Sequence, residues 1–249
     1  MDRKSPLILS IDTATPCSSV ALTLGTRQDG RVVAAFSLTG KVTHSRRLLS
    51  VIDLLMVETV RTWQDIDGIA ISLGPGSFTG LRIGMATAKG LAAAAGKVLI
   101  GISTLDALAS KCVSDKLICA VLDARKKKVY AAFYRLGDDG LIERVSEQAV
   151  LQPQELAAQV TEPVIMVGDG ALVYGEFFRT LLGERVMLAP AQLHEPSAAS
   201  IGFLAGEKLL RGELLDLAEG VPTYIRSSDA ELNLLKKKSM AQGQERDDC

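Results

Sequence analysis

The sequence predicts an α/β protein of two similar lobes, because the same order of strands and helices occurs twice along the chain. In each half, an apolar strand ends at an aspartate, Asp12 in the first half and Asp123 in the second. In each half, a later strand runs into a glycine-containing turn before a helix, at residues 72–84 and 168–170. These features favour a duplicated unit of the order β-β-β-α-β-α, with a cleft between the two copies.

The first half begins with three β-runs separated by turn residues, which are Leu7–Ile11, Ser19–Leu24 and Val32–Leu38. A helix is predicted over Ser45–Trp63, where Thr43 can cap the first turn and apolar residues recur at helical spacing. The half is completed by a strand, a glycine turn, a helix and a last strand, with the regular elements at Ile69–Ser72, Leu81–Ala95 and Val98–Ile102.

The second half repeats this plan with three β-runs, a helix, a strand and a helix, at Leu117–Leu122, Val129–Tyr134, Leu141–Val150, Pro153–Val160, Val164–Val167 and Tyr174–Leu182. The chain therefore divides into an N-terminal lobe (1–110), a C-terminal lobe (111–228) and a polar, flexible tail (229–249).

Composition excludes several classes of protein. The 249 residues include 47% hydrophobic residues, enough for two moderate cores. The net charge is −1, so the chain lacks the overall cationic field that drives nucleic-acid binding. The four cysteines form no C-x-x-C pair, which predicts reduced thiols and no zinc site. The apolar run near the N-terminus is too short for a signal peptide or a membrane span, so we expect a cytoplasmic protein.

The glycine turn at residues 72–84 is the most informative segment. Glycines there allow backbone conformations that side chains forbid, and Ser77 or Thr79 can cap the helix that follows. Free amides at such a helix start attract anions, although a tight turn that only packs the helix on the sheet is the alternative. The candidate nucleotide- or phosphate-binding residues are Asp12, Thr13, Gly74, Gly76, Ser77, Thr79, Asp123 and Arg125.

Two familiar nucleotide motifs are absent from this turn. A Walker loop requires Lys and then Ser or Thr after its last glycine, whereas Leu81 and Arg82 follow Gly80. The dinucleotide fingerprint requires a glycine where Thr79 stands. Asp12 has a structural alternative as well, since a strand-end aspartate often accepts hydrogen bonds from its own turn.

Two lobes with facing aspartates and turns are similar to the actin-like (ASKHA) superfamily, whose lobes have duplicated ribonuclease-H-like folds. Within it, the chain closely resembles the TsaB family of small partner subunits in bacterial synthesis of threonylcarbamoyladenosine on transfer RNA. The resemblance is carried by Ile11–Thr15, Ser19–Leu22, Thr43–Leu49, the glycine turn Gly74–Gly84, Gly101–Leu105, Asp123–Arg125, Val129–Ala131 and Pro222–Arg226.

The resemblance implies a scaffold or activator rather than an enzyme. Such a chain binds a TsaD-like catalytic subunit, recruits a TsaE-like ATPase and meets transfer RNA only indirectly through the complex. It implies no cofactor or metal of its own, since ATP or ADP and the metal are expected in the partner subunits. A homodimer is expected when the partner is missing.

The predicted partner-binding surface lies on the two helices of the first lobe. Gly80, Gly84, Ala88 and Ala92 recur every four residues and would let a second helix approach closely. The alternative is that this stripe packs on the chain's own sheet. The complete set of partner-binding candidates is His44, Leu48, Leu49, Ile52, Leu55, Met56, Gly80, Leu81, Gly84, Met85, Ala88, Leu91 and Ala92.

Two enzyme classes are the rivals of this interpretation. A stand-alone ATP-dependent kinase or ATPase would use Asp12, Asp123 and both turns to hold a magnesium nucleotide. A hydrolase would use Ser77 as nucleophile, but nothing in the sequence places a base beside it. The two histidines, His44 and His194, lie too far apart in the sequence to form the paired metal site of the TsaD relatives.

Overall fold

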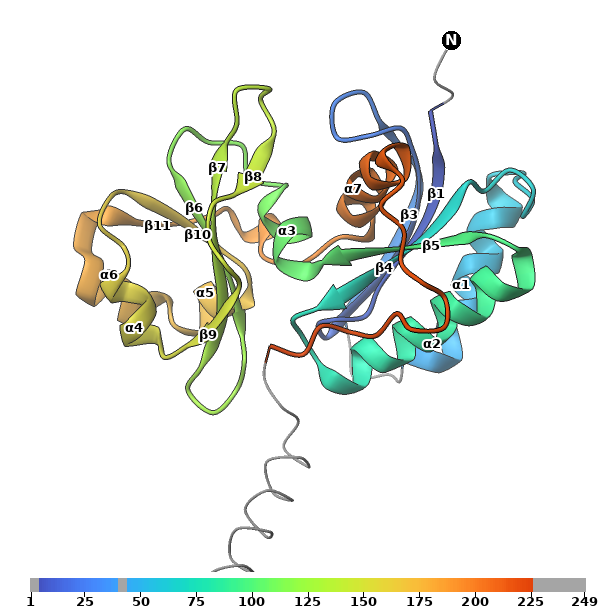
Figure 1. Cartoon of the computed structure of the whole chain (residues 1–249). Coiled ribbons are helices and arrows are strands. Elements are labelled where there is room, and N and C mark those ends of the chain that lie inside the picture. The colour runs from blue at the N-terminus through green and yellow to red at the C-terminus, as the bar shows by residue number, and fades with distance from the viewer. Residues whose placement is uncertain (1–4, 40–43, 226–249) are drawn as a thin grey trace, which may run out of the picture.

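The computed structural model describes residues 5–39 and 44–225, with side chains from residue 48 onward in the second range. The predicted tail, residues 229–249, and the predicted cap Thr43 lie outside the described residues, as does the side chain of His44. Figure 1 shows two α/β lobes side by side, with the first sheet and its helices in one lobe and the second sheet in the other.

The first sheet has five strands in the order β3-β2-β1-β4-β5. The pairs β1–β2 and β2–β3 are antiparallel, whereas β4 lies parallel to both β1 and β5. The strands are β1 (Leu7–Asp12), β2 (Cys17–Leu24), β3 (Arg31–Thr39), β4 (Gly68–Gly74) and β5 (Val98–Ser103). Helices α1 (His44–Glu58) and α2 (Phe78–Ala95) flank this sheet (Figure 1).

The second sheet repeats the order as β8-β7-β6-β10-β11, with β9 also paired to β7. Its strands are β6 (Leu117–Asp123), β7 (Val129–Leu136), β8 (Ile142–Arg144), β9 (Ala149–Leu151), β10 (Val164–Val167) and β11 (Val186–Leu188). The helical elements are α4 (Pro153–Ala158), α5 (Asp169–Val173), α6 (Gly175–Leu182), η1 (Gly183–Arg185) and η2 (Ala191–Leu193). The predicted duplication and the two-lobed α/β fold class are therefore confirmed.

The last helix of each half packs on the sheet of the other half. Helix α3 (Thr104–Ala109) follows β5, and its Leu105 and Leu108 join the core of the second sheet. Helix α7 (Ala198–Arg211) follows β11, and its Ile201 and Ala205 pack with Ile8 of the first sheet. Helix α7 thus packs on the first sheet, although it lies within the expected C-terminal lobe, 111–228.

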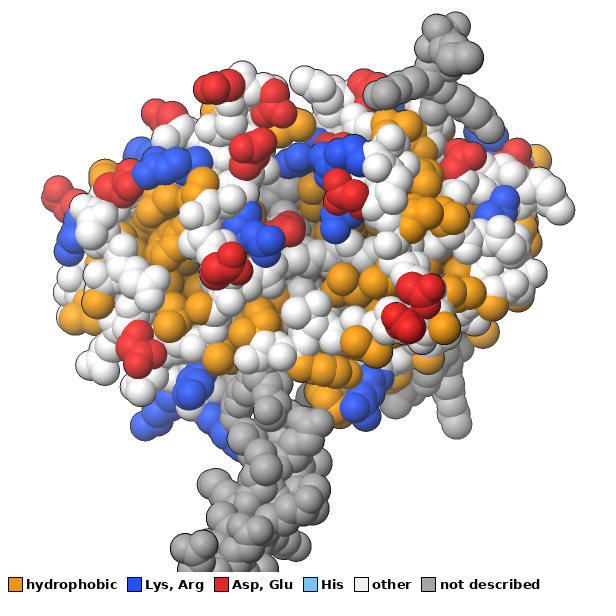
Figure 2. All heavy atoms as spheres, viewed as in Figure 1, with side chains coloured by type: hydrophobic (Ala, Val, Ile, Leu, Met, Phe, Trp, Pro, Cys, Tyr) orange, Lys and Arg blue, Asp and Glu red, His pale blue; other side chains and the backbone are white. Residues whose placement is uncertain are grey.

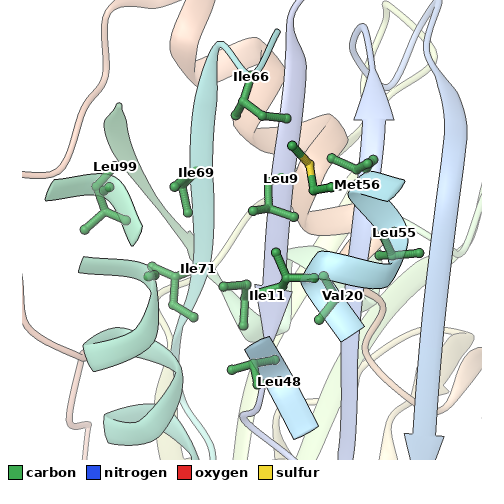
Figure 3. Packing of buried hydrophobic residues seen from close by; sticks show 14 of the residues in the cluster. Leu9, Ile11, Val20, Leu48, Leu55, Met56, Ile66, Ile69, Ile71 and Leu99 are labelled. Carbon is green, nitrogen blue, oxygen red and sulfur yellow. The ribbon is translucent and has the colours of Figure 1, made fainter. Parts of the chain in front are cut away.

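The largest core of the first lobe lies between its sheet and helix α1. Figure 3 shows side chains of β1 and β4 meeting those of α1, with Leu48 and Met56 pointing toward the strands. Ile69 and Ile71 of β4 are fully buried there. Complete burial of such an aliphatic side chain contributes about 2 kcal/mol, so this face of α1 is fixed by its own sheet.

Candidate functional site

The glycine turn is clamped onto the loop that follows β1. Ser77 caps α2, because its side chain accepts a hydrogen bond from the Gly80 N–H at 3.3 Å. The Ser77 N–H donates to the Ala14 carbonyl at 2.6 Å, and the Thr13 hydroxyl donates to the Gly80 carbonyl at 2.7 Å. The Gly80 and Ser77 N–H groups, which could have bound a phosphate, are therefore hydrogen-bonded within the chain.

Close approach explains the glycines of this turn. A Cβ at Gly80 would overlap the Thr13 carbonyl oxygen, and one at Gly76 would overlap the Ala14 carbonyl oxygen. Gly74 has a φ of +106°, a conformation that L side chains rarely adopt. The packing interpretation of the turn accounts for all three positions, whereas binding of a phosphate by Gly74, Gly76, Ser77 and Thr79 stays a prediction.

Asp12 stabilises its own turn, as the structural alternative for this residue anticipated. Its side chain is fully buried, and Oδ1 accepts a hydrogen bond from the Ala14 N–H at 2.9 Å. The neighbouring Thr13 is also fully buried. The structure thus brings Asp12 and Thr13 together with the glycine turn of the first lobe.

Asp123 and Arg125 form a corresponding group in the second lobe. The Asp123 carboxylate accepts a hydrogen bond from the Arg125 N–H at 2.9 Å and pairs with the Arg125 guanidinium at 3.1 Å. The Asp123 N–H donates to Oδ1 of Asp169 at 2.9 Å. Burial raises the pKa of the Asp169 carboxyl, and the neighbouring Asp123 charge adds to this effect.

The predicted stripe of small residues on α2 faces the chain's own sheet, which corrects the expectation that it offers an open surface. The members of the stripe are buried, and so are two residues that flank it. The members are Gly80, Gly84, Ala88 and Ala92, and the flanking residues are Leu81 and Met85. A Cβ at Gly84 would meet the Thr13 side chain and would lie 2.9 Å from Cδ1 of Ile71. The stripe therefore allows close packing within the monomer.

The predicted residues of α1 divide between two faces. Leu48, Ile52, Leu55 and Met56 are buried in the first core, so their predicted role as an open partner-binding surface also needs correction. Leu49 has 56% of its surface exposed, and Leu91 of α2 is half-buried. Of the predicted partner-binding set with described side chains, these two remain accessible in the monomer.

Apart from Leu49, sequence reasoning missed the residues on the outer faces of the same helices, which we call the docking face. On α1 and just beyond it, exposed apolar side chains recur at Leu49 (56%), Leu54 (49%), Val57 (64%) and Val60 (88%). On α2 the exposed residues are Arg82 near the helix start and five small residues, Thr79, Ala86, Gly90, Ala93 and Ala94. The signal was present in the sequence as a second helical repeat, displaced around each helix from the buried one.

A cluster of aromatic rings and a guanidinium joins the start of α2 to the C-terminal segment. The Arg82 guanidinium lies 3.8 Å from the centre of the Phe78 ring. Its Nε donates to the Tyr224 hydroxyl at 3.1 Å, and the Phe78 and Tyr224 rings are 5.0 Å apart. The Thr223 N–H also donates to the Leu73 carbonyl at 2.8 Å, so this segment is fixed beside the glycine turn.

The described residues offer little catalytic apparatus. His194 is buried in the second lobe, where Nδ1 accepts from the Gly168 N–H at 3.1 Å and Nε2 lies 2.8 Å from the Ala189 carbonyl. No group of three or more potential metal ligands occurs among the described residues. Within the same part of the chain, no helix is long and apolar enough to cross a membrane.

These features define a two-lobed α/β protein with a duplicated sheet and an exposed helical face on its first lobe. Comparison with known proteins then specifies the family. The model of the family described as "TsaD: tRNA N6-adenosine threonylcarbamoyltransferase" matches residues 39–234. The chain belongs to the TsaB (YeaZ) family, as its sequence motifs predicted, because two curated relatives of that name match nearly its whole length.

Two curated relatives carry the name "tRNA threonylcarbamoyladenosine biosynthesis protein TsaB". The protein from Bacillus subtilis (strain 168) is 31% identical over 235 residues, which cover 93% of this chain and 99% of the relative. The protein from Escherichia coli (strain K12) is 32% identical over 231 residues, which cover 90% and 96%.

A solved structure from Pseudomonas aeruginosa is described as an uncharacterized protein with similarity to peptidase YEAZ. It superposes with a TM-score of 0.75 at 30% identity, covering 89% of this chain and 100% of that structure. The similarity thus extends over both lobes.

Proposed function

We propose that this chain is a non-catalytic partner subunit in the synthesis of threonylcarbamoyladenosine, at the adenosine next to the anticodon of ANN-decoding transfer RNAs. It binds a TsaD-like catalytic subunit, and a TsaE-like ATPase joins the pair. The names of the B. subtilis and E. coli relatives, which match nearly the whole chain, support this role. ATP or ADP and the metal belong to the partner subunits.

The exposed docking face is the observation that carries the proposal. Large aliphatic side chains on α1 are exposed to solvent beside α2, whose outer residues beyond Arg82 are small. Several large apolar side chains exposed on one helix are typical of a protein–protein contact site. Gly90, with open space around its Cβ position, lets a partner helix approach the α2 backbone closely.

The proposal assigns the chemistry to the partner because the candidate catalytic residues of this chain have structural roles. Ser77 caps α2, and His194 satisfies backbone groups of Gly168 and Ala189. Asp12 holds the loop after β1. These interactions weaken the two enzyme alternatives, a stand-alone ATPase or kinase and a hydrolase.

Binding of a TsaD-like subunit to variants of the docking face tests the proposal. We expect Val57→Glu to weaken binding at least about 30-fold, because it would bury an unpaired carboxylate in the interface. Gly90→Leu should weaken binding through steric overlap, while the monomer has room for the new side chain. Titration calorimetry with the purified full-length chains measures both effects.

Val113→Glu is the matched control, since Val113 is 75% exposed and lies outside the docking face. Binding by Val57→Glu and Gly90→Leu at the wild-type affinity would refute the assignment of the interface. Tight binding of magnesium ATP to the chain alone would instead favour the ATPase or kinase alternative.

A further inference from the structure

We propose that the turn between β6 and β7, Arg125–Lys128, contacts the phosphodiester backbone of RNA directly. The inference rests on the function proposed above and adds to it, because there the chain meets transfer RNA only through its partners. The turn joins the C-terminal end of β6 to β7 at the lower end of the second lobe in Figure 1.

Four consecutive cationic residues, Arg125, Lys126, Lys127 and Lys128, make up this turn, and all four are exposed. The whole chain has a net charge of −1, so this local excess of positive charge is not a consequence of overall composition. Figure 2 shows basic side chains gathered at the lower end of this lobe, where the turn lies. Like charges on consecutive residues repel one another, because screening at physiological salt acts only over about 8 Å.

The backbone of the turn is strained. Arg125, Lys126 and Lys127 have φ values of +59°, +52° and +58°, in the left-handed region that disfavours residues with a Cβ. Each such residue is strained by its Cβ, and glycine would avoid this strain. A turn with three cations in this conformation keeps its charged side chains in spite of both strain and repulsion, which indicates a use for the charge.

The acidic residues near the turn fix its first residues by hydrogen bonds and an ion pair. Asp123 binds the Arg125 N–H and guanidinium, and Asp169 binds the Asp123 N–H. Within the described part of the chain, the side chains of Lys127 and Lys128 have no ion-pair partner. The start of the turn is therefore fixed, and the ammonium groups of Lys127 and Lys128 are exposed to solvent.

A phosphodiester chain fits these groups because its charges are of one sign and regularly spaced. Lysine binds phosphate as a flexible point charge and needs no base-specific geometry. An acidic protein segment is the competing occupant, and the experiment separates the two.

The experiment compares binding of an unmodified transfer RNA transcript to the full-length chain and to Lys127→Gly/Lys128→Ala, each alone and with the TsaD-like subunit. Glycine relieves the strain at position 127, so this variant should fold at least as well as the wild type. We expect affinity to fall roughly tenfold, and the slope of log Kobs against log salt to fall by about 1.5, for two lost phosphate contacts. Fluorescence anisotropy between about 50 and 200 mM salt measures both quantities.

Arg31→Ala/Lys116→Ala is the control, because it removes two exposed cations from other parts of the surface. Its affinity should stay within twofold of the wild type. Wild-type affinity and slope in the turn variant would overturn the inference. The inference would also be overturned if the wild-type chain bound no transcript, either alone or with the TsaD-like subunit. In that case, unimpaired pairing with the TsaD-like subunit would leave the proposed function intact. Loss of that pairing in the turn variant, with RNA binding retained, would identify an acidic protein as the occupant and refute the RNA contact.

Discussion

The Thr13 carbonyl oxygen occupies the space that a Cβ at Gly80 would need, and the Thr13 hydroxyl donates to the Gly80 carbonyl at 2.7 Å. Helix α2 is thereby seated directly on the loop that ends β1. This contact joins the two segments that the sequence first suggested as a nucleotide cradle. The contact fixes the distance between α2 and the sheet, and it thereby fixes the position of the docking face.

Gly80→Ala should destabilise the fold by about 3 kcal/mol, because the new methyl group must displace backbone atoms of a buried loop. Gly90→Ala in the same helix has no neighbour within 4 Å, and it should stabilise the fold by about 0.5–1 kcal/mol through better helix propensity. Urea unfolding of both variants measures the two free energies. Equal effects at positions 80 and 90 would contradict the proposed seating of α2.

The same geometry explains why the sequence could predict the stripe of small residues but not the surface against which it packs. Gly80 and Gly84 on α2 have a counterpart in Gly202 and Gly206 on α7, and both pairs are spaced by four residues. In each case the missing side chain lets a helix lie close to the first sheet or its connecting loops. Small residues at this spacing predict a close approach, but they do not specify whether the surface approached is the chain's own or a partner's.

Features that the local sequence encodes could be predicted, whereas features that depend on contacts distant in the sequence could not. Most strands of both lobes, but not β11, could be predicted, as could Ser77 as the cap of α2 and the duplication, because periodicity and turn residues encode them locally. The exchange of α3 and α7 between lobes could not, since their apolar faces fit either sheet. The expected single strand over 141–150 is two short strands, β8 and β9, and the Ser146 hydroxyl accepts from the Phe133 N–H between them.

Val60 should be a residue at which stability and partner binding oppose each other. It follows α1 in a left-handed conformation with φ of +52°, and the Arg61 N–H closes the helix end by donating to the Met56 carbonyl at 2.9 Å. A β-branched residue is strained there, and glycine is the usual occupant. Val60→Gly should therefore stabilise the free chain by about 1 kcal/mol and weaken binding of the TsaD-like subunit.

Thermal unfolding and calorimetry on the same preparation measure the two effects of Val60→Gly. Val113→Gly is the comparison, because Val113 is similarly exposed and has no positive φ. A variant at position 60 that gains stability but keeps full affinity would remove this residue from the docking face.

The stability of the second lobe should fall as pH rises through the acid range because of Asp169. Burial raises the pKa of this carboxyl above its ordinary value of 3.8, so the folded chain holds the proton more tightly than the unfolded chain. The penalty for ionising the buried group is absent below the unfolded pKa and is fully present above the folded pKa. Asp169→Asn keeps an oxygen for the Asp123 N–H and removes the charge.

We expect the stability of Asp169→Asn relative to wild type to increase from about pH 3 upward and then to level off toward neutral pH, once the wild-type carboxyl is ionised in both states. Urea unfolding at a series of pH values measures this difference. Asp139→Asn is a suitable control, since Asp139 is exposed in the β7–β8 turn and accepts a hydrogen bond from the Leu141 N–H. A difference between Asp169→Asn and wild type that did not change with pH would show that burial of this carboxyl has no energetic effect.

Arg27 should hold the two lobes together. Its Nε and Nη2 donate to the Glu207 carboxylate at 2.8 Å each, and Nη1 donates to the Ile142 carbonyl at 2.7 Å. Glu207 lies on α7, which packs on the first sheet, whereas Ile142 belongs to the second sheet. The two charged side chains are only 17% and 13% exposed, so removal of one leaves the other poorly solvated.

Arg27→Met should therefore cost about 2–3 kcal/mol in unfolding free energy, and Glu207→Gln should cost less because the amide can still accept a hydrogen bond. The double variant should lose less than the sum of the two single losses, since each removes the same ion pair. A third variant, Arg135→Met, breaks an ion pair with Glu162 whose side chains are 45% and 42% exposed, and its cost should stay below about 1 kcal/mol. If Arg27→Met and Arg135→Met were equally mild, the contact between Arg27 and the second lobe would contribute nothing to holding the lobes together, and that role would fall to the helices α3 and α7.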